Sequence, residues 1–212
     1  MRRGLVAAPG YPFLGGCAAL IFLGWLLSWA WLVVLGILGG GFFAYFFRDP
    51  ERPIPEDAGV IVSPADGKVV IVDEVHEDRM LRGPARRVAI FMNVFDCHVN
   101  RSPVGATVAV VTHRDGEFRA AFKHDADRGN EQQATLLEGA YGRRVLVVQI
   151  AGLLARRIIG WVHPGQRLAK GERLGMICFG SRVDLYLPRD CHIMVKVGDR
   201  LKAGSSIVGR WT

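Results

Sequence analysis

The sequence predicts a mainly β domain preceded by an N-terminal hydrophobic helical hairpin, and two observations carry this prediction. No charged residue lies between Tyr11 and Phe47. Beyond Pro55, short runs rich in Val and Ile alternate with Gly, Pro and Asp, which is typical of strands joined by turns. No apolar stripe of comparable length with helical spacing follows Phe47. The 212 residues have room for one compact domain and an appendage.

The apolar segment Tyr11–Phe47 holds 37 residues. A membrane-spanning helix needs about 20 apolar residues, so the segment is too long for one simple span and barely long enough for two. Ser28 and Trp29 lie near its middle, and Trp favours the membrane interface. We therefore expect helices over Phe13–Leu27 and Ala30–Phe47, forming a hairpin that crosses the bilayer or dips into it. A single tilted span is the alternative, whereas a signal peptide is disfavoured by the length of the run.

Basic residues border the predicted anchor, residues 1–47, on both sides. Arg2 and Arg3 precede the apolar segment and Arg48 follows it. Such residues favour the cytoplasmic side, so we expect a cell-membrane protein whose domain 48–212 lies on the cytoplasmic face. The net charge is +7, and subtracting Arg2 and Arg3 leaves +5 for that domain. A basic face beside an anchor favours anionic lipid headgroups, although solubility alone would also explain the charge.

The remaining composition argues against two other classes of partner. The sequence has no lysine-rich run with interleaved aromatic residues, so we expect no nucleic acid. None of the four cysteines forms a CxxC pair, so we expect no metal and no redox centre, and free thiols in a reducing compartment.

The predicted strands after Pro55 are short and separated by turn residues. They form a small sandwich or barrel. The stretch Glu117–Glu138 is predicted to be a loop with a short helix. The strands cover Lys68–Val75, Arg87–Phe95, Val104–Thr112, Val145–Ile150, Arg156–Val162 and Val183–Leu187.

One internal repeat refines the predicted fold. Val162–Gly171 matches Lys196–Gly204 at an offset of 33 residues. Gly165 then coincides with Gly198, and Gly171 with Gly204. Two such strand–turn units resemble the folding unit of lipoyl and biotinyl carrier domains, so the expected domain is a lipoyl/biotinyl-like β sandwich or barrel; chance turn chemistry is the alternative. A carrier lysine at Lys196 is disfavoured, because Lys196 runs directly into the Gly198 turn.

The pair Gly180-Ser181 lies between two apolar runs. It fits an ordinary β turn with a locally hydrogen-bonding Ser. It also fits a self-processing bond, because a preceding Gly leaves the carbonyl open to attack by the Ser hydroxyl. The resulting ester would eliminate to dehydroalanine, and hydrolysis would give an N-terminal pyruvoyl group, an electron sink that replaces pyridoxal phosphate.

Attack by Ser requires a base, and the base requires an orienting group. Asp66 lies in a turn framed by Pro64 and Gly67, just before a predicted strand. His98 lies in a polar break after the predicted strand Arg87–Phe95. Asp66, His98 and Ser181 would form a triad on a β scaffold, although the sequence offers six His and several other Asp.

Four motifs in this order resemble phosphatidylserine decarboxylases, most closely the short bacterial and archaeal form. They are Phe-Phe-Arg-Asp-Pro from Phe46, Ser-Pro-Ala-Asp-Gly from Ser63, Cys-His-Val-Asn-Arg-Ser-Pro from Cys97, and Phe-Gly-Ser from Phe179. The resemblance extends from Phe46 to Ile207.

The resemblance implies a zymogen that cleaves itself between Gly180 and Ser181. Residues 1–180 would form the β chain and residues 181–212 the α chain, associated as a heterodimer. Ser181 would become the covalent pyruvoyl cofactor, activated for cleavage by His98 and Asp66. The pyruvoyl carbonyl would form a Schiff base with phosphatidylserine in the membrane, and loss of CO2 would give phosphatidylethanolamine for phospholipid biosynthesis.

The sequence departs from the long form of the family at Arg101, where a second His is expected. Arg101 can instead hold a phosphate or carboxylate, and Asn130 and Glu131 can line the headgroup site. His98 would then serve both steps, or another group would take one of them. Two other functions remain open: a pyruvoyl decarboxylase of a soluble amino acid, and a membrane-tethered adaptor without enzymatic activity. The sequence leaves a higher oligomer and the acyl-chain preference open.

Overall fold

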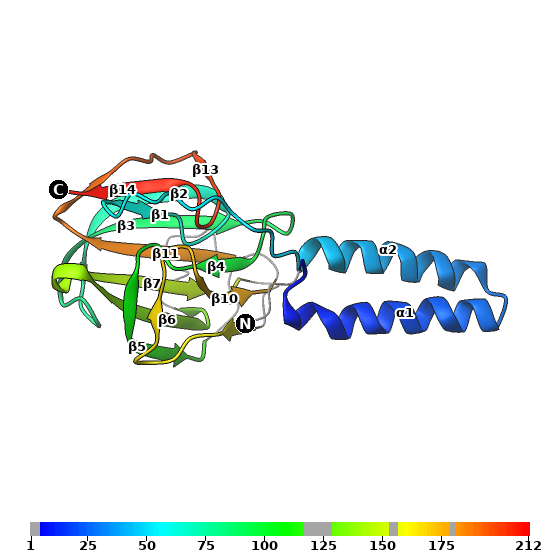
Figure 1. Cartoon of the computed structure of the whole chain (residues 1–212). Coiled ribbons are helices and arrows are strands. Elements are labelled where there is room, and N and C mark those ends of the chain that lie inside the picture. Colours follow the sequence, from blue (N-terminus) through cyan, green and yellow to red (C-terminus); the bar gives the residue numbers. More distant parts are fainter. Residues whose placement is uncertain (1–4, 117–128, 153–156, 179–180) are drawn as a thin grey trace. The chain divides into compact units, whose positions relative to one another are not determined.

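A computed structural model describes residues 5–116, 129–152, 157–178 and 181–212 (Figure 1). The chain divides into two compact units, one that ends at Glu51 and one that begins at Arg52. The predicted mainly β fold with an N-terminal apolar helix pair is confirmed.

The first unit is a helical hairpin. A short 3-10 turn, η1 (Ala8–Gly10), leads into α1 (Tyr11–Leu26), and α2 (Ala30–Phe46) returns beside it (Figure 1). Gly24 and Gly36 permit close packing, since a Cβ on Gly36 would lie 2.6 Å from Cγ1 of Ile21. The turn between the helices contains Ser28 at a φ of 56°.

The outer surface of this hairpin is apolar. Large side chains including Phe22, Trp25, Trp31 and Leu38 are exposed. Ala8–Leu26 is long and apolar enough to cross a membrane, and α2 is a shorter apolar helix of 17 residues. Exposed apolar surface on this scale is typical of a membrane-associated segment.

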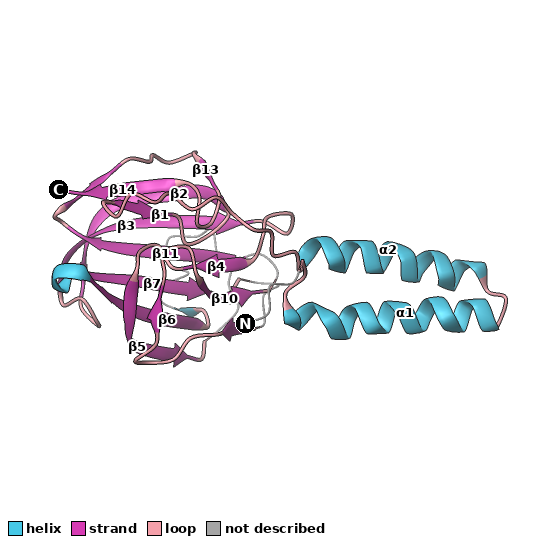
Figure 2. Ribbon diagram, viewed as in Figure 1, coloured by secondary structure: helices cyan, strands magenta, loops and turns pink. Residues whose placement is uncertain are grey.

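The second unit is built from antiparallel strands (Figure 2). Eight of them form one curled sheet in the order β13-β2-β3-β11-β7-β6-β5-β9. Two three-stranded sheets have the orders β1-β14-β12 and β4-β10-β8. The bounds are β1 Val60–Val62, β2 Gly67–Glu77, β3 Gly83–Met92, β4 Val99–Arg101, β5 Ala106–Arg114, β6 Gln132–Gly139, β7 Arg144–Ile150, β8 Ile158–Gly160, β9 Arg167–Leu168, β10 Arg173–Ile177, β11 Ser181–Pro188, β12 Cys191–Ile193, β13 Arg200–Leu201 and β14 Ile207–Trp211; a 3-10 turn, η2 (Ala140–Gly142), joins β6 to β7.

The large sheet buries side chains on both faces. Alternate residues of a strand point to opposite faces. On β11, Val183, Leu185 and Leu187 belong to the main apolar core, whereas Tyr186 belongs to a second cluster on the other face. We call these the inner and the reverse face of the sheet.

The prediction of a loop over Glu117–Glu138 is wrong for its last part. Gln132–Gly139 forms β6, paired with β5 on one side and β7 on the other. Leu136 and Leu137 point to opposite faces and are both buried. The stretch lacks the Val/Ile enrichment of the other strands, so its sequence carries no strand signal. It becomes a strand because β5 and β7 pair with it and bury its apolar residues on both faces of the sheet.

The internal repeat is larger in the structure than in the sequence. The amide of Gly198 donates to the carbonyl of Val69, and that of Gly165 donates equivalently to Val108. Both copies place a register shift at that point of the ladder, and both pair a Gly-turn strand with the start of a long strand. One copy therefore joins residues 62–71 to 196–204, and the other joins residues 101–110 to 163–171.

Candidate active site

Ser181 is the first residue of β11, where the strand is held on both sides. It lies opposite Met92 of β3, and the next residue, Arg182, lies opposite Phe91 and Ile150. The Ser181 side chain is fully buried, and its register with Met92 places it on the inner face. Its hydroxyl has no hydrogen-bond partner among the described residues. A buried hydroxyl without a partner is uncommon and is available for reaction. Gly180, predicted to precede the cleaved bond, lies outside the described residues.

The segment from Met92 to His98 joins the residue opposite Ser181 to the predicted base. One end of this segment faces Ser181 through Met92. At the other end, the carbonyl of His98 accepts a hydrogen bond from the amide of Ile177. Segments 92–98 and 177–181 are thus tied together at both ends. The imidazole of His98 is fully buried, and its contact with Ser181 stays a prediction.

Two side chains shape the turn before His98. The amide of Asn93 donates to Oδ2 of Asp96, and Oδ1 of Asn93 accepts from the amide of Phe95. Local bonds of this kind are typical of Asn and Asp in turns. They define the turn that delivers His98 to the start of β4.

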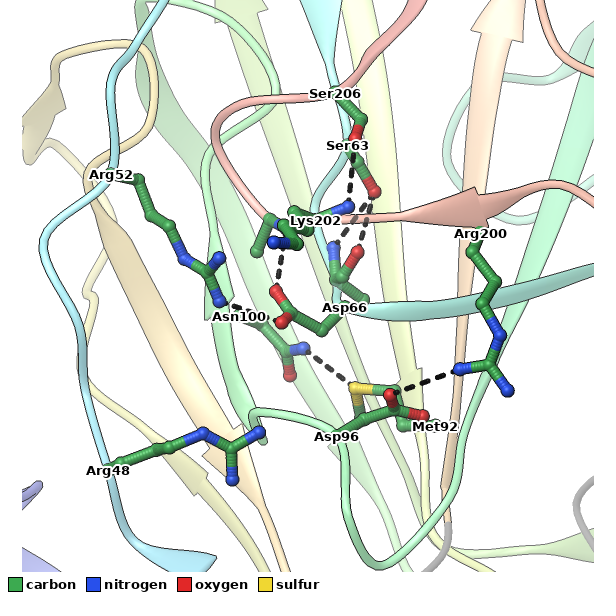
Figure 3. Close-up of polar contacts among 12 residues, drawn as sticks. Arg48, Arg52, Ser63, Asp66, Met92, Asp96, Asn100, Arg200, Lys202 and Ser206 are labelled. Atoms are coloured by element: carbon green, nitrogen blue, oxygen red, sulfur yellow. Dashed lines mark hydrogen bonds and ion pairs between the residues drawn. The ribbon is translucent and has the colours of Figure 1, made fainter. Parts of the chain in front are cut away.

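Asp66 lies beside the same turn (Figure 3). Its Oδ2 accepts from Nη2 of Arg52 at 2.7 Å, and its Oδ1 accepts from the amide of Ala203 at 2.8 Å. Burial raises the pKa of Asp66 above its ordinary value, helped by the nearby Asp96, while Ala203 and Arg52 oppose the shift. Neither hydrogen bond involves His98, so the pairing of Asp66 with His98 stays a prediction.

Arg101 is buried in the structure. Its Nη1 donates to the carbonyl of Gly171 at 3.1 Å, and a Cβ on Gly204 would lie 3.1 Å from its Cδ. Arg101 thus packs on the second glycine turns of both repeat copies. The predicted role in substrate binding remains a hypothesis.

Asn130 and Glu131 lie at the same end of the large sheet as Ser181. The carbonyl of Glu131 accepts from the amide of Ala151, and Nδ2 of Asn130 donates to the carbonyl of Ala151. Arg182 lies opposite Ile150, the residue before Ala151. Both residues are buried, and Oε1 of Glu131 lies 3.4 Å from Nε2 of His113.

The reverse face of β11 carries a buried ion pair that sequence reasoning missed. Nε and Nη2 of Arg182 bind the two carboxylate oxygens of Asp184 at 2.7 and 2.9 Å, and neither side chain is exposed. Arg87 lies nearby and pairs with Asp73 at 2.7 Å. The hydrogen bond to Asp73 raises the pKa of Arg87 most, and Tyr186 and Asp184 add to this rise. The spacing of Arg182 and Asp184, two residues apart on a strand, is the sequence signal for their common face.

A row of buried amides on the inner face was also missed. It joins Gln133, Gln149 and Asn100 and ends at the sulfur of Met92. Only Asn100 lies in a motif that the sequence singled out.

The other histidines and the cysteines have different surroundings. His76, His163 and His192 are exposed, and His124 lies outside the described residues. Burial raises the pKa of Cys178, and raises that of Cys191 to about 11, so both thiols are neutral at pH 7. Among the described residues, no group of three or more His, Cys, Asp or Glu side chains could hold a metal ion.

Comparison with known proteins gives a consistent result. The sequence profile of the phosphatidylserine decarboxylase family matches residues 40–209. A phosphatidylserine decarboxylase proenzyme of Symbiobacterium thermophilum is 47% identical over 210 residues, which cover 99% of this chain and 97% of that protein. Proteins with the same description from Carboxydothermus hydrogenoformans and Desulfotalea psychrophila are 45% and 40% identical, over 95% and 97% of this chain and 94% and 96% of their own.

Proposed function

This chain belongs to the phosphatidylserine decarboxylase family, and we propose that it becomes active by cleaving itself between Gly180 and Ser181. As a carboxy-lyase it removes CO2 from phosphatidylserine and releases phosphatidylethanolamine. The match over nearly the whole chain favours this function over a soluble amino-acid decarboxylase and over an adaptor.

The observation that carries the proposal is the buried, unpartnered hydroxyl of Ser181 beside the segment that delivers His98. In the first step Oγ of Ser181 bonds to the carbonyl carbon of Gly180 and its proton passes to His98. His98 then returns this proton to the Ser181 nitrogen as the C–N bond breaks, which leaves an ester. Loss of the Cα proton then expels the Gly180 carboxylate and leaves dehydroalanine. One water converts this to a pyruvoyl group and ammonia.

The surroundings of Ser181 fit a pyruvoyl group. The inner face there is buried, and its apolar residues include Met92, Ala151 and Val183. Such surroundings exclude water from an electrophilic carbonyl. When present, the group supplies a carbonyl that takes up the electrons released with CO2. We propose that His98 moves protons there and that Arg101, Asn130 and Glu131 orient the headgroup.

The strand order also supports the proposed two-chain product. Residues 181–212 contain β11, β12, β13 and β14. β11 pairs with β3 and β7, β13 pairs with β2, and β14 pairs with β1. All of these partners lie before Gly180, so the α and β chains would stay associated through backbone hydrogen bonds.

The decisive experiment is the intact mass of the purified protein. We expect chains of 180 and 32 residues, the smaller one blocked at its N-terminus, and a single chain for Ser181→Ala. His98→Ala should also prevent splitting, whereas Arg101→Ala should split normally and bind substrate less well, because a guanidinium does not accept a proton near neutral pH. An active wild-type protein that is full length would refute self-cleavage. Splitting of His98→Ala at the wild-type rate would exclude His98 as the base.

The anchor is a second part of the proposal. We propose that residues 1–47 hold residues 48–212 at the cytoplasmic face of the cell membrane, since the exposed surface of α1 and α2 is apolar. Deleting residues 1–47 should release the protein into the soluble fraction and should slow turnover of bilayer phosphatidylserine more than turnover of a short-chain, soluble analogue. A truncated protein that still sediments with vesicles of anionic lipid would assign the attachment to the basic surface instead.

A further inference from the structure

We propose that the side-chain amide of Asn100 donates the hydrogen bond that stabilises the negatively charged oxygen formed when Ser181 attacks, and that Gln149 and Gln133 fix its orientation. This inference rests on the proposed self-cleavage. It assigns three residues that the sequence motifs do not explain.

The first observation is the direction of the buried amide row. Nε2 of Gln133 donates to Oε1 of Gln149 at 3.1 Å, and Nε2 of Gln149 donates to Oδ1 of Asn100 at 2.8 Å. Because its oxygen is occupied by Gln149, Asn100 must present its nitrogen at the other end. The row therefore works as a polarised chain whose last member is an N–H donor.

The second observation is the weak acceptor that the donor meets. Nδ2 of Asn100 lies 3.5 Å from Sδ of Met92, and a thioether is a poor acceptor. The second N–H of this amide has no acceptor among the described residues, although the side chain is fully buried. A buried N–H that lacks a strong acceptor in the resting protein can donate to an oxygen that becomes charged during the reaction.

The third observation places this donor at the reacting residue. Met92 is the residue opposite Ser181 in the ladder between β3 and β11. Asn100 lies on β4, and His98 immediately precedes that strand. The donor and the proposed base therefore come from one short segment, and the donor contacts the residue opposite Ser181.

The facing sheet leaves room for the row through two glycines. Asn100, Gly175 and Gly160 are in register across β4, β10 and β8. A Cβ on Gly160 would lie 2.5 Å from Nε2 of Gln133, and one on Gly175 would lie 3.2 Å from Nε2 of Gln149. Any residue larger than Gly at position 160 or 175 would therefore collide with the side-chain amides of Gln133 or Gln149. The two glycines leave the space that the amide row occupies.

The proposed step is simple in its electron balance. When Oγ of Ser181 bonds to the carbonyl carbon before it, the π electrons of that carbonyl move to its oxygen. A hydrogen bond from Asn100 stabilises this charge before the C–N bond breaks. Loss of one such donor slows acyl-transfer enzymes about 10²–10³-fold.

The test is a time course of chain splitting by intact mass, in the full chain, with folding checked by thermal unfolding. Asn100→Ala should slow splitting by about 10²-fold. Gln149→Glu should also slow it strongly, because a carboxylate at position 149 accepts the Asn100 amide and turns its oxygen toward Met92. Thr135→Val, a buried position two residues after Gln133 on β6, is the matched control and should split normally.

One further variant separates a donor from a purely structural hydrogen bond. Asn100→Asp donates only when protonated, so its splitting rate relative to Asn100→Ala should rise as the pH falls. This ratio cancels the titration of the base.

The outcomes distinguish the inference from the function on which it rests. A wild-type protein that does not split overturns the self-cleavage proposal. A wild-type protein that splits, together with Asn100→Ala and Gln149→Glu variants that split equally fast, overturns only the role of Asn100.

Discussion

The two copies of the internal repeat have the same backbone but different chemistry. In one copy the carbonyl of Ser63 accepts from the amide of Gly204, and in the other the carbonyl of Ser102 accepts from the amide of Gly171. The two copies also bond to each other reciprocally, since the amide of Val62 donates to Pro103 and that of Arg101 donates to Pro64. The difference comes three residues after each Ser, where one copy has Asp66 and the other has Gly105.

This difference indicates that the turn itself does not need Asp66. The second copy forms the same turn with Gly105, whose Cβ would lie 3.8 Å from the amide of Lys170, and Gly105 has no side chain that could accept from this amide. The equivalent amide of Ala203 is capped by Asp66. Because the turn forms without the cap, we predict that the buried carboxylate of Asp66 serves the reaction rather than the turn. Four predictions test this comparison, from the largest expected effect to the smallest.

Replacing Asp66 with the residue of the other copy should have the largest effect. Asp66→Gly should still fold but should split about 10²-fold more slowly, at the lower end of what acid–base groups contribute. The measurement is the time course of splitting by intact mass. Gly105→Asp, the reverse change in the other copy, is the control and should split at the wild-type rate. Normal splitting of Asp66→Gly would show that the two turns are equivalent in function as well as in backbone.

The two serines should be equivalent in stability. Oγ of Ser63 donates to the carbonyl of Ala65 and Oγ of Ser102 donates to that of Val104, each at 2.7 Å and buried. Ser63→Ala and Ser102→Ala should each lower the free energy of unfolding by about 1–3 kcal/mol, since each leaves a buried carbonyl unsatisfied. Denaturant unfolding in a Ser181→Ala background, which keeps the chain intact, measures both. A difference of more than about 1 kcal/mol between the two variants would break the structural equivalence of the copies.

The glycine turns should show a graded effect. Gly204 has a φ of +78° and Gly198 a φ of +103°, both in the region that favours glycine. An Ala at either position should lower the free energy of unfolding by about 1–2 kcal/mol through backbone strain. Gly204→Ala should be the more destabilising, because its Cβ would also press on Cδ of Arg101 at 3.1 Å, whereas Gly198 has open space. Equal losses of the free energy of unfolding for the two variants would mean that the Arg101 side chain moves aside without cost.

The smallest expected effect is a pH dependence that only one copy can have. Burial raises the pKa of Asp66 above its value of 3.8 in an unfolded chain. The resulting contribution of Asp66 to the free energy of unfolding is fully present below the pKa of the unfolded chain. It is lost as the pH rises through the pKa of the folded protein. The free energy of unfolding of the Ser181→Ala protein, minus that of Ser181→Ala/Asp66→Asn, should therefore decrease as the pH rises from about 3 to 7. A difference that increases with pH would mean that Arg52 and Ala203 outweigh burial and lower this pKa.

Much of the fold was predictable because it depends on local patterns. The uncharged segment Tyr11–Phe47 and the Ser28-Trp29 break predicted two helices, and the structure begins and ends them within two residues of the predicted bounds. Most Val/Ile runs became strands, and the matched glycines adopt positive φ angles in both copies. These features are decided by hydropathy and by backbone sterics, which a single stretch of chain already contains.

The candidate site was predictable only in part. Ser181 and His98 were found from their motifs, and strand pairing brings their segments together. Asp66 lies beside the same turn but bonds to Arg52 and Ala203. The partners Arg52 and Ala203 are separated by most of the domain sequence, so no local signal could have shown which of them would reach the carboxylate.

The sequence by itself determined the mainly β class, the apolar hairpin, the glycine turns and the residue types available for chemistry. The tertiary structure alone decided that β6 is a strand, that Arg182 and Asp184 are buried together, and that three amides from β6, β7 and β4 form one row. The physical reason is register. A side chain's neighbours across a sheet depend on which residues of distant strands lie opposite each other, and that pairing is set by the whole core.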